Sequence, residues 1–152
     1  MQKHAEKNTS ENGILELATF YIGDALCGID ILRIQEINKQ TEVTTVPQAA
    51  EYVQGVLNLR GRIVTIIDLG IKLGLSSIEP GKDNRTIIVD FKDEQIGLLV
   101  DSISDVLVAE ASRIEPPPSN IGGVQGRFFH GVFKTEKKLI GLLDINAVLD
   151  EH

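Results

Sequence analysis

The sequence contains no tryptophan, one cysteine, three histidines and few aromatic residues. Aromatic residues make up 5% and apolar residues 42% of the 152 residues, so we expect a core of isoleucine, leucine and valine. The single cysteine, Cys27, cannot form an internal disulfide and gives no indication of an oxidising compartment. The N-terminal segment has no apolar core, and no apolar run approaches the about 20 residues of a membrane span. We therefore expect a cytoplasmic protein without membrane insertion.

The sequence also lacks a cluster of basic residues, and its formal net charge is −7. Proteins that bind nucleic acids neutralise phosphates with lysine and arginine side chains. Peripheral membrane proteins use the same side chains to bind anionic lipids. The charge pattern therefore argues against both nucleic acid and an anionic bilayer as partners.

Catalytic and metal-binding patterns are equally scarce. His4 and His152 lie near the chain ends, His130 lies near a turn, and no spacing of histidine, cysteine and acidic residues matches a metal site. The glycines of IGGVQG (121–126) are not followed by Lys-Ser/Thr, so this segment does not match a phosphate-binding loop. We predict no catalytic residue, no metal and no cofactor. A catalytic carboxylate pair among the 22 acidic residues stays open, and with it a small β-barrel enzyme or ligand-binding protein.

Short apolar segments separated by turn residues predict a mainly β fold. Three pairs of predicted strands flank such turns: 15–22 and 26–31 around Gly23-Asp24, 85–92 and 95–102 around Asp93-Glu94, and the two parts of VLNLRGRIVTIIDL (56–69) around Gly61. These hairpins account for much of the apolar sequence, so the fold is expected to consist of strands with few helices.

Two short helices are predicted between the strands. Pro47 can begin a helix over 47–54 that Gly55 ends. Asp68 can cap a second helix over 69–75.

The polar composition of residues 1–13 predicts a disordered arm. Residues 14–150 are expected to form a single domain of two intertwined lobes, approximately 14–75 and 85–150, which the polar segment 76–84 connects.

The two halves of the chain resemble each other. GIDILRIQEI (28–37) matches GLLVDSISDV (97–106), VQG at 53–55 matches VQG at 124–126, and IVTIIDL (63–69) matches LIGLLDI (139–145). A repeat of roughly 70 residues is too long for a solenoid and predicts two similar modules, each a small barrel, that share an aliphatic core. In this alignment Phe128, Phe129 and His130 replace Leu57, Asn58 and Leu59, and the second hairpin (129–139) is longer than the first.

The segments GIDILRIQEI, VQGVLNLRGRIVTIIDLGIKLGL and GLLVDSISDVL resemble the CheW family of bacterial chemotaxis coupling proteins. The resemblance extends from about Ile14 to Leu149, and the NLRG motif at 58–61 is its most specific part. It implies two five-stranded, SH3-like β-barrel subdomains around a common hydrophobic core, with short helices.

The resemblance also implies a function. It indicates a non-catalytic adaptor that links the cytoplasmic tip of a methyl-accepting chemoreceptor to the regulatory domain of the histidine kinase CheA. Such a protein would be located in the cytoplasm, associated with receptor arrays at the inner membrane. A coupling protein of another chemosensory pathway, for example one that controls surface motility, stays open.

Family resemblance assigns receptor-binding roles to six residues: Ile34, Glu36, Gly55, Arg60, Ile103 and Val106. Arg60 interrupts an apolar segment, where a charge must be paired, reach water or serve a partner. We expect it to pair with Glu36 at a partly exposed rim. Alternative roles are structural: a salt bridge between strands for this pair, ordinary core positions for the aliphatic residues, and a helix stop for Gly55. The sequence does not assign residues to the CheA contact.

Overall fold

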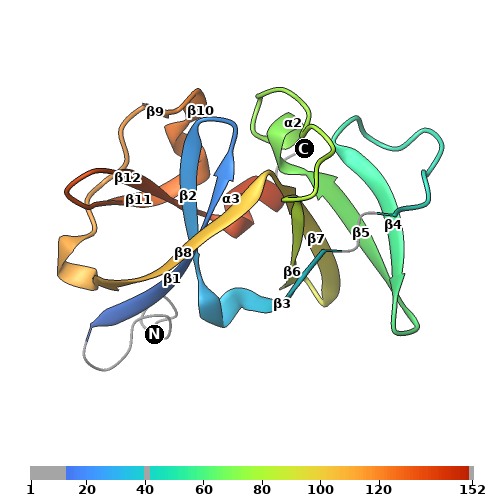
Figure 1. Cartoon of the computed structure of the whole chain (residues 1–152), viewed down its shortest axis with the longest axis horizontal. Coiled ribbons are helices and arrows are strands. Elements are labelled where there is room, and N and C mark those ends of the chain that lie inside the picture. Colours follow the sequence, from blue (N-terminus) through green and yellow to red (C-terminus); the bar gives the residue numbers. More distant parts are fainter. Residues whose placement is uncertain (1–12, 40–41, 151–152) are drawn as a thin grey trace.

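The computed structural model describes residues 13–39 and 42–150 and shows a mainly β protein with short helices (Figure 1). The predicted arm over 1–13 lies outside the described residues except for Gly13. Sheet A has the strand order β11-β12-β2-β1-β8, and sheet B has the order β3-β6-β7-β5-β4. A two-stranded ribbon, β9 (Asn120–Ile121) and β10 (Val124–Gln125), is added to these.

Sheet A consists of β1 (Ile14–Ile22), β2 (Ala25–Asp30), β8 (Ser102–Glu110), β11 (Phe129–Lys134) and β12 (Leu139–Leu143). Sheet B consists of β3 (Ile34–Asn38), β4 (Val53–Leu59), β5 (Arg62–Asp68), β6 (Arg85–Phe91) and β7 (Glu94–Val100). The helices are α2 (Leu69–Lys72), α3 (Ile145–Leu149) and the 3-10 turns η1 (Ile31–Arg33), η2 (Ala111–Arg113) and η3 (Gly126–Phe128). The mainly β class with two five-stranded units is confirmed, and closure of each sheet into a barrel stays a prediction.

Each sheet takes strands from both halves of the sequence. The segments 14–75 and 85–150 meet through the parallel pairs β5–β7 in sheet B and β12–β2 in sheet A, and through the antiparallel pairs β3–β6 and β1–β8. The halves of the sequence are therefore not the two sheets, because the chain crosses between the sheets within each half.

The strand registers confirm the internal duplication. The hairpin β1–β2 pairs Thr19 with Gly28, and the hairpin β6–β7 pairs Ile88 with Gly97. Each of these glycines is also next to a parallel strand, since Gly28 faces Leu142 and Gly97 faces Ile66. The two sheets are thus equivalent strand for strand.

The alignment of the repeat around Gly55 was wrong. After a bulge, Gly55 pairs with Ile66, and at the same position of the second copy Gly131 pairs with Leu142. Gly131, not Gly126, is therefore the equivalent of Gly55. In this register Lys134, paired with Leu139, replaces Asn58, paired with Ile63.

The second hairpin is also no longer than the first. In the second copy Thr135 donates its backbone N–H to Lys138 O at 2.8 Å, which leaves two residues in the turn. In the first copy the pair Leu59–Arg62 also leaves two residues in the turn. Glu136 consequently occupies the place of Arg60.

The predicted helix over 47–54 is absent: the segment forms turns, and β4 begins at Val53. Gly55 lies inside β4, where the backbone of Thr44 pairs with Val56 through two hydrogen bonds of 2.8 Å. This tertiary pairing overrides the local helix signal of Pro47. The helix after Asp68 is confirmed in part, because Asp68 Oδ1 accepts a hydrogen bond from Ile71 N at 3.1 Å and α2 ends at Lys72.

One hydrophobic cluster, mostly aliphatic with a few phenylalanines, extends across both sheets and confirms the predicted shared core. It includes Phe20 and Cys27 of sheet A, Ile66 and Ile88 of sheet B, and Val148 of α3, all fully or almost fully buried. In Figure 1, α3 lies between the two sheets. Burial of such side chains, each contributing roughly 1.5–3 kcal/mol, holds the two sheets together.

Candidate docking surfaces

Arg60 lies at the tip of the β4–β5 hairpin, not inside a strand. Arg60 and Gly61 form the two-residue turn and both have positive φ values, +52° and +85°. A two-residue turn of this kind follows the twist of the flanking strands. Asn58 Oδ1 accepts a hydrogen bond from Gly61 N at 2.9 Å, which closes the turn from the first strand. The turn therefore projects the Arg60 side chain, 70% exposed, beyond the apolar part of both strands.

The expected ion pair between Arg60 and Glu36 is present. Arg60 Nη2 donates to Glu36 Oε1, and Asn38 Nδ2 donates to the other carboxylate oxygen, Oε2, at 3.1 Å. Hydrogen bonds from Asn38 and Arg60 hold the pKa of the Glu36 carboxyl below its usual value. The charged pair thus joins β3 to the tip of the β4–β5 hairpin and links the two edge strands of sheet B at one end, which we call its mouth.

Gly55 is buried on β4, beneath the backbone of residue 44. A Cβ atom at Gly55 would lie 2.4 Å from Thr44 O, a distance that real Cβ contacts do not reach. The helix-stop interpretation of Gly55 was therefore wrong. The glycine permits close approach of the preceding segment to the β4 edge.

Bulges place Ile34, Ile103 and Val106 on equivalent faces of the two sheets. On β8, Ile103 pairs with Phe20 and Val106 pairs with Ala18, so the bulge between them keeps both side chains on one face. On β3, Ile34 pairs with Val89 and packs partly buried against the shared core, as Ile103 does.

The bulge on β3 divides the six candidate residues between two places. Glu36 pairs with Ile88, the neighbour of Val89 on β6, so Glu36 projects from the opposite face to Ile34. One group, Ile34, Ile103 and Val106, lies on faces that border the shared core. The other group, Glu36, Gly55 and Arg60, lies on the other side of sheet B. β3 and β8 are edge strands of different sheets, and among the described strands no pairing joins them.

Val108 and Leu32 are exposed apolar residues that were not predicted from the sequence, and Val108 lies beside the predicted Val106. Val106 and Val108 are 60% and 62% exposed and project from the same face of β8, because they pair with Ala18 and Glu16. Leu32, at 71% exposure, lies in η1, which contacts β1. In the sequence, the run Val106-Leu107-Val108 could have indicated this exposed surface, because it puts apolar side chains on both faces of an edge strand.

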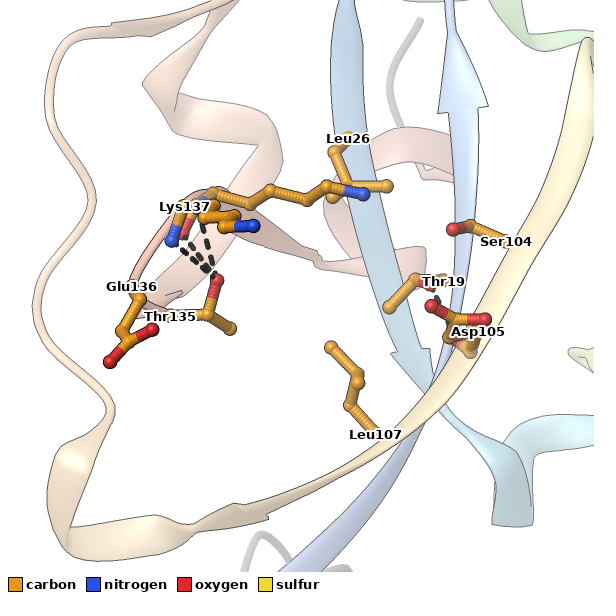
Figure 2. Close-up of a pocket in the computed structure, with 9 residues that line it drawn as sticks. Thr19, Leu26, Ser104, Asp105, Leu107, Thr135, Glu136 and Lys137 are labelled. Atoms are coloured by element: carbon orange, nitrogen blue, oxygen red, sulfur yellow. Dashed lines mark hydrogen bonds between the residues drawn. The ribbon is translucent and has the colours of Figure 1, made fainter.

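The mouth of sheet A differs from that of sheet B. There, Asp105 and Glu136 take the places of Glu36 and Arg60, and two acidic side chains cannot form an ion pair. A pocket of about 430 Å³ lies between β8 and the turn of the β11–β12 hairpin. Figure 2 shows Asp105 and Glu136 on opposite sides of this pocket, with Leu26 and Leu107 also lining it. Among the described residues, these two equivalent positions therefore form a charged pair in sheet B and not in sheet A.

Neither metal-binding groups nor membrane-spanning helices occur within the described part of the chain. Over residues 13–39 and 42–150, no group of three histidine, cysteine or acidic side chains could hold a metal ion. No helix in these ranges is long and apolar enough to cross a membrane.

Comparison with known proteins decides the family. The model of the CheW-like domain matches residues 16–152. The chain belongs to the CheW family. It is 35% identical over 137 residues to the chemotaxis protein CheW of Rhizobium meliloti (strain 1021), covering 90% of this chain and 88% of the relative. It is 32% identical over 148 residues to the chemotaxis protein CheW of Bacillus subtilis (strain 168), covering 97% and 92%.

A solved CheW structure has the same fold. The scaffolding protein TtCheW from Thermoanaerobacter tengcongensis superposes with a TM-score of 0.83 at 30% sequence identity, covering 91% of this chain and 94% of that chain. The CheW family resemblance noted in the sequence is thus confirmed.

Proposed function

We propose that this CheW-family chain is a non-catalytic chemotaxis adaptor that couples methyl-accepting chemoreceptors to the histidine kinase CheA. Relatives over most of the chain are named chemotaxis proteins, and the structural neighbour is named a scaffolding protein. The observation that carries the proposal is the nature of the surface: an exposed, ion-paired arginine on a hairpin tip and exposed valines on an edge strand. The adaptor acts in the cytoplasm, at receptor arrays on the inner membrane, as a single domain over residues 14–150.

The apolar group on β3 and β8 is proposed to bind the receptor tip. Helical partners bind through apolar side chains that enter a hydrophobic surface. Val106 and Val108 offer such exposed side chains, and Ile34 and Ile103 are partly buried beside the shared core. Binding would remove the valines from water and extend the core outward.

The charged group on sheet B is proposed to orient the same partner, which would reach around the edge strand β3, because Ile34 and Glu36 are two residues apart on opposite faces of that strand. Arg60 retains an exposed guanidinium while it is paired with Glu36, so it can donate further hydrogen bonds to a docked protein. Charges at the rim of an interface contribute more to orientation and specificity than to raw affinity. Gly55 supports this group indirectly, because close approach to Thr44 holds the preceding segment on β4. The regulatory domain of CheA is proposed as the second partner, without assignment of residues.

A pull-down tests the proposal. The full chain is immobilised and incubated with a purified CheA regulatory domain and with a chemoreceptor-tip fragment, separately and together. We expect both to be retained. Retention of neither would contradict the proposal. Retention only of the corresponding proteins from a surface-motility pathway would instead support the alternative pathway.

A further inference from the structure

Two asparagine hydrogen bonds flank the ion pair at the mouth of sheet B. Asn38 donates to Glu36 Oε2 at 3.1 Å, Glu36 Oε1 receives Arg60, and Asn58 Oδ1 accepts from Gly61 N at 2.9 Å. Each asparagine thus holds one end of the pair: Asn38 fixes the acceptor on β3, and Asn58 fixes the turn that carries the donor.

The second copy of the repeat serves as an internal comparison. At the equivalent positions it has Leu107 for Asn38, Asp105 for Glu36, Glu136 for Arg60 and Lys134 for Asn58. The second copy therefore has neither the ion pair nor an asparagine at either of the two positions. The turn there is held differently, by Thr135 Oγ1, which accepts from Lys138 N at 3.0 Å. The two turns also differ in backbone conformation, since Arg60 and Gly61 both have positive φ values and Glu136 and Lys137 do not. The asparagines therefore accompany both the ion pair and this turn conformation.

The geometry of the turn explains why Asn58 matters. Arg60 is a non-glycine residue at a φ of +52°, a region that L-residues adopt rarely. The hydrogen bond from Gly61 to Asn58 favours this conformation and so fixes the direction in which the Arg60 side chain leaves the turn. Without it, the exposed tip can adopt other turn conformations in which the guanidinium moves away from Glu36.

We propose that Asn38 and Asn58 are positioning residues that hold the Glu36–Arg60 pair in the geometry that a docked partner requires. The proposal rests on the proposed adaptor function, because it concerns the same surface. Neither asparagine needs to contact the partner. Their contribution is preorganisation: the pair is already oriented before binding, so less conformational freedom is lost on docking.

The test uses four variants of the full chain. Asn38→Ala removes the donor to Glu36, and Asn58→Ala removes the acceptor for Gly61. Asn58→Asp keeps an oxygen acceptor at the same place. Asn120→Ala is the matched control, because Asn120 Oδ1 accepts from Gly123 N at 3.0 Å in the distant β9–β10 turn. Binding to the receptor-tip fragment and to the CheA regulatory domain is measured by calorimetry, and the Glu36 carboxyl is titrated by carbon-13 NMR.

We expect Asn38→Ala and Asn58→Ala to weaken binding to at least one partner about three- to tenfold, the range of one lost hydrogen bond. Asn58→Asp should restore most of the affinity, and Asn120→Ala should bind as the wild type does. Asn38→Ala should also raise the Glu36 pKa toward its ordinary value, a readout that a general loss of stability does not move.

Unchanged affinity and an unchanged Glu36 pKa in both alanine variants would overturn the positioning roles. Equal weakening by Asn120→Ala would also overturn them, since it would indicate a general effect of turn stability. Failure of the wild-type chain to bind either partner would overturn the proposed function instead, and the Glu36 titration would still decide whether Asn38 positions the carboxylate.

Discussion

Gly55 and Gly131 are equivalent residues in the two copies of the repeat. Each follows a bulge in the first strand of a hairpin, and each is covered by the preceding segment, through Thr44 in one copy and through Ile114 and Glu115 in the other. At both positions a side chain would collide with that segment. Glycine is therefore required by the fold itself, in a chain that repeats the same arrangement twice.

Replacement of Gly55 by alanine tests this requirement. The added Cβ would lie 2.4 Å from Thr44 O, so the segment must move away from β4. We expect Gly55→Ala to lower the free energy of unfolding by on the order of 1–3 kcal/mol, measured by urea denaturation. Gly81→Ala is the control, because the nearest atom, Glu79 O, is 4.0 Å from a Cβ there. Equal stability of the two variants would show that the segment is not held as described.

Removal of the Arg60 guanidinium should affect binding more than folding. Exposed ion pairs contribute little to stability, whereas truncating a charge that an interface buries is costly. We expect Arg60→Ala to weaken receptor-fragment binding by about tenfold or more, with almost no change in the urea midpoint. If binding and stability instead fell in proportion, the Glu36–Arg60 pair would act as a structural link between strands, and its docking role would be contradicted.

A charge on the exposed face of β8 should block the receptor. Val106 is 60% exposed, so Val106→Asp should change the free energy of unfolding by about 1 kcal/mol or less. We expect it to abolish measurable binding of the receptor-tip fragment, because a carboxylate would be buried without a partner. Val106→Thr, which keeps the branched shape, should retain part of the affinity. Wild-type affinity of Val106→Asp would place the receptor elsewhere.

Cys27 should be inert in the native protein. Its side chain is fully buried in the shared core, and this burial raises the pKa of the thiol to about 12. At about pH 8 almost no thiolate is present, so a disulfide reagent should react only after urea unfolds the chain. Rapid reaction under native conditions would indicate that β2 opens locally and that the core is less tightly held.

Local signals in the sequence predicted the elements that local physics determines. The turns at Gly23-Asp24 and Gly61, the cap at Asp68 and the repeat of roughly 70 residues were all visible, because turn residues, caps and hydrophobic patterns act over a few residues. The Glu36–Arg60 pair was predicted with the help of the CheW family resemblance.

Long-range contacts limited the rest. Pro47 favoured a helix, but the pairing of Thr44 with Val56 holds the preceding segment against β4, and the residues between them form turns. The parallel pairs β5–β7 and β12–β2, through which each sheet takes strands from both halves, leave no local pattern. The exposed face of β8 depends on a bulge, and the correct alignment of Gly131 with Gly55 needed the strand register.

The most direct measurement of the central claim is a co-sedimentation assay with membranes that contain chemoreceptors. CheA is added with or without this chain, and the kinase in the membrane pellet is quantified. The adaptor account predicts that CheA sediments with the receptors when the wild-type chain is present and largely remains in the supernatant without it or with Arg60→Ala. An amount of CheA in the pellet that does not depend on this chain would contradict the account.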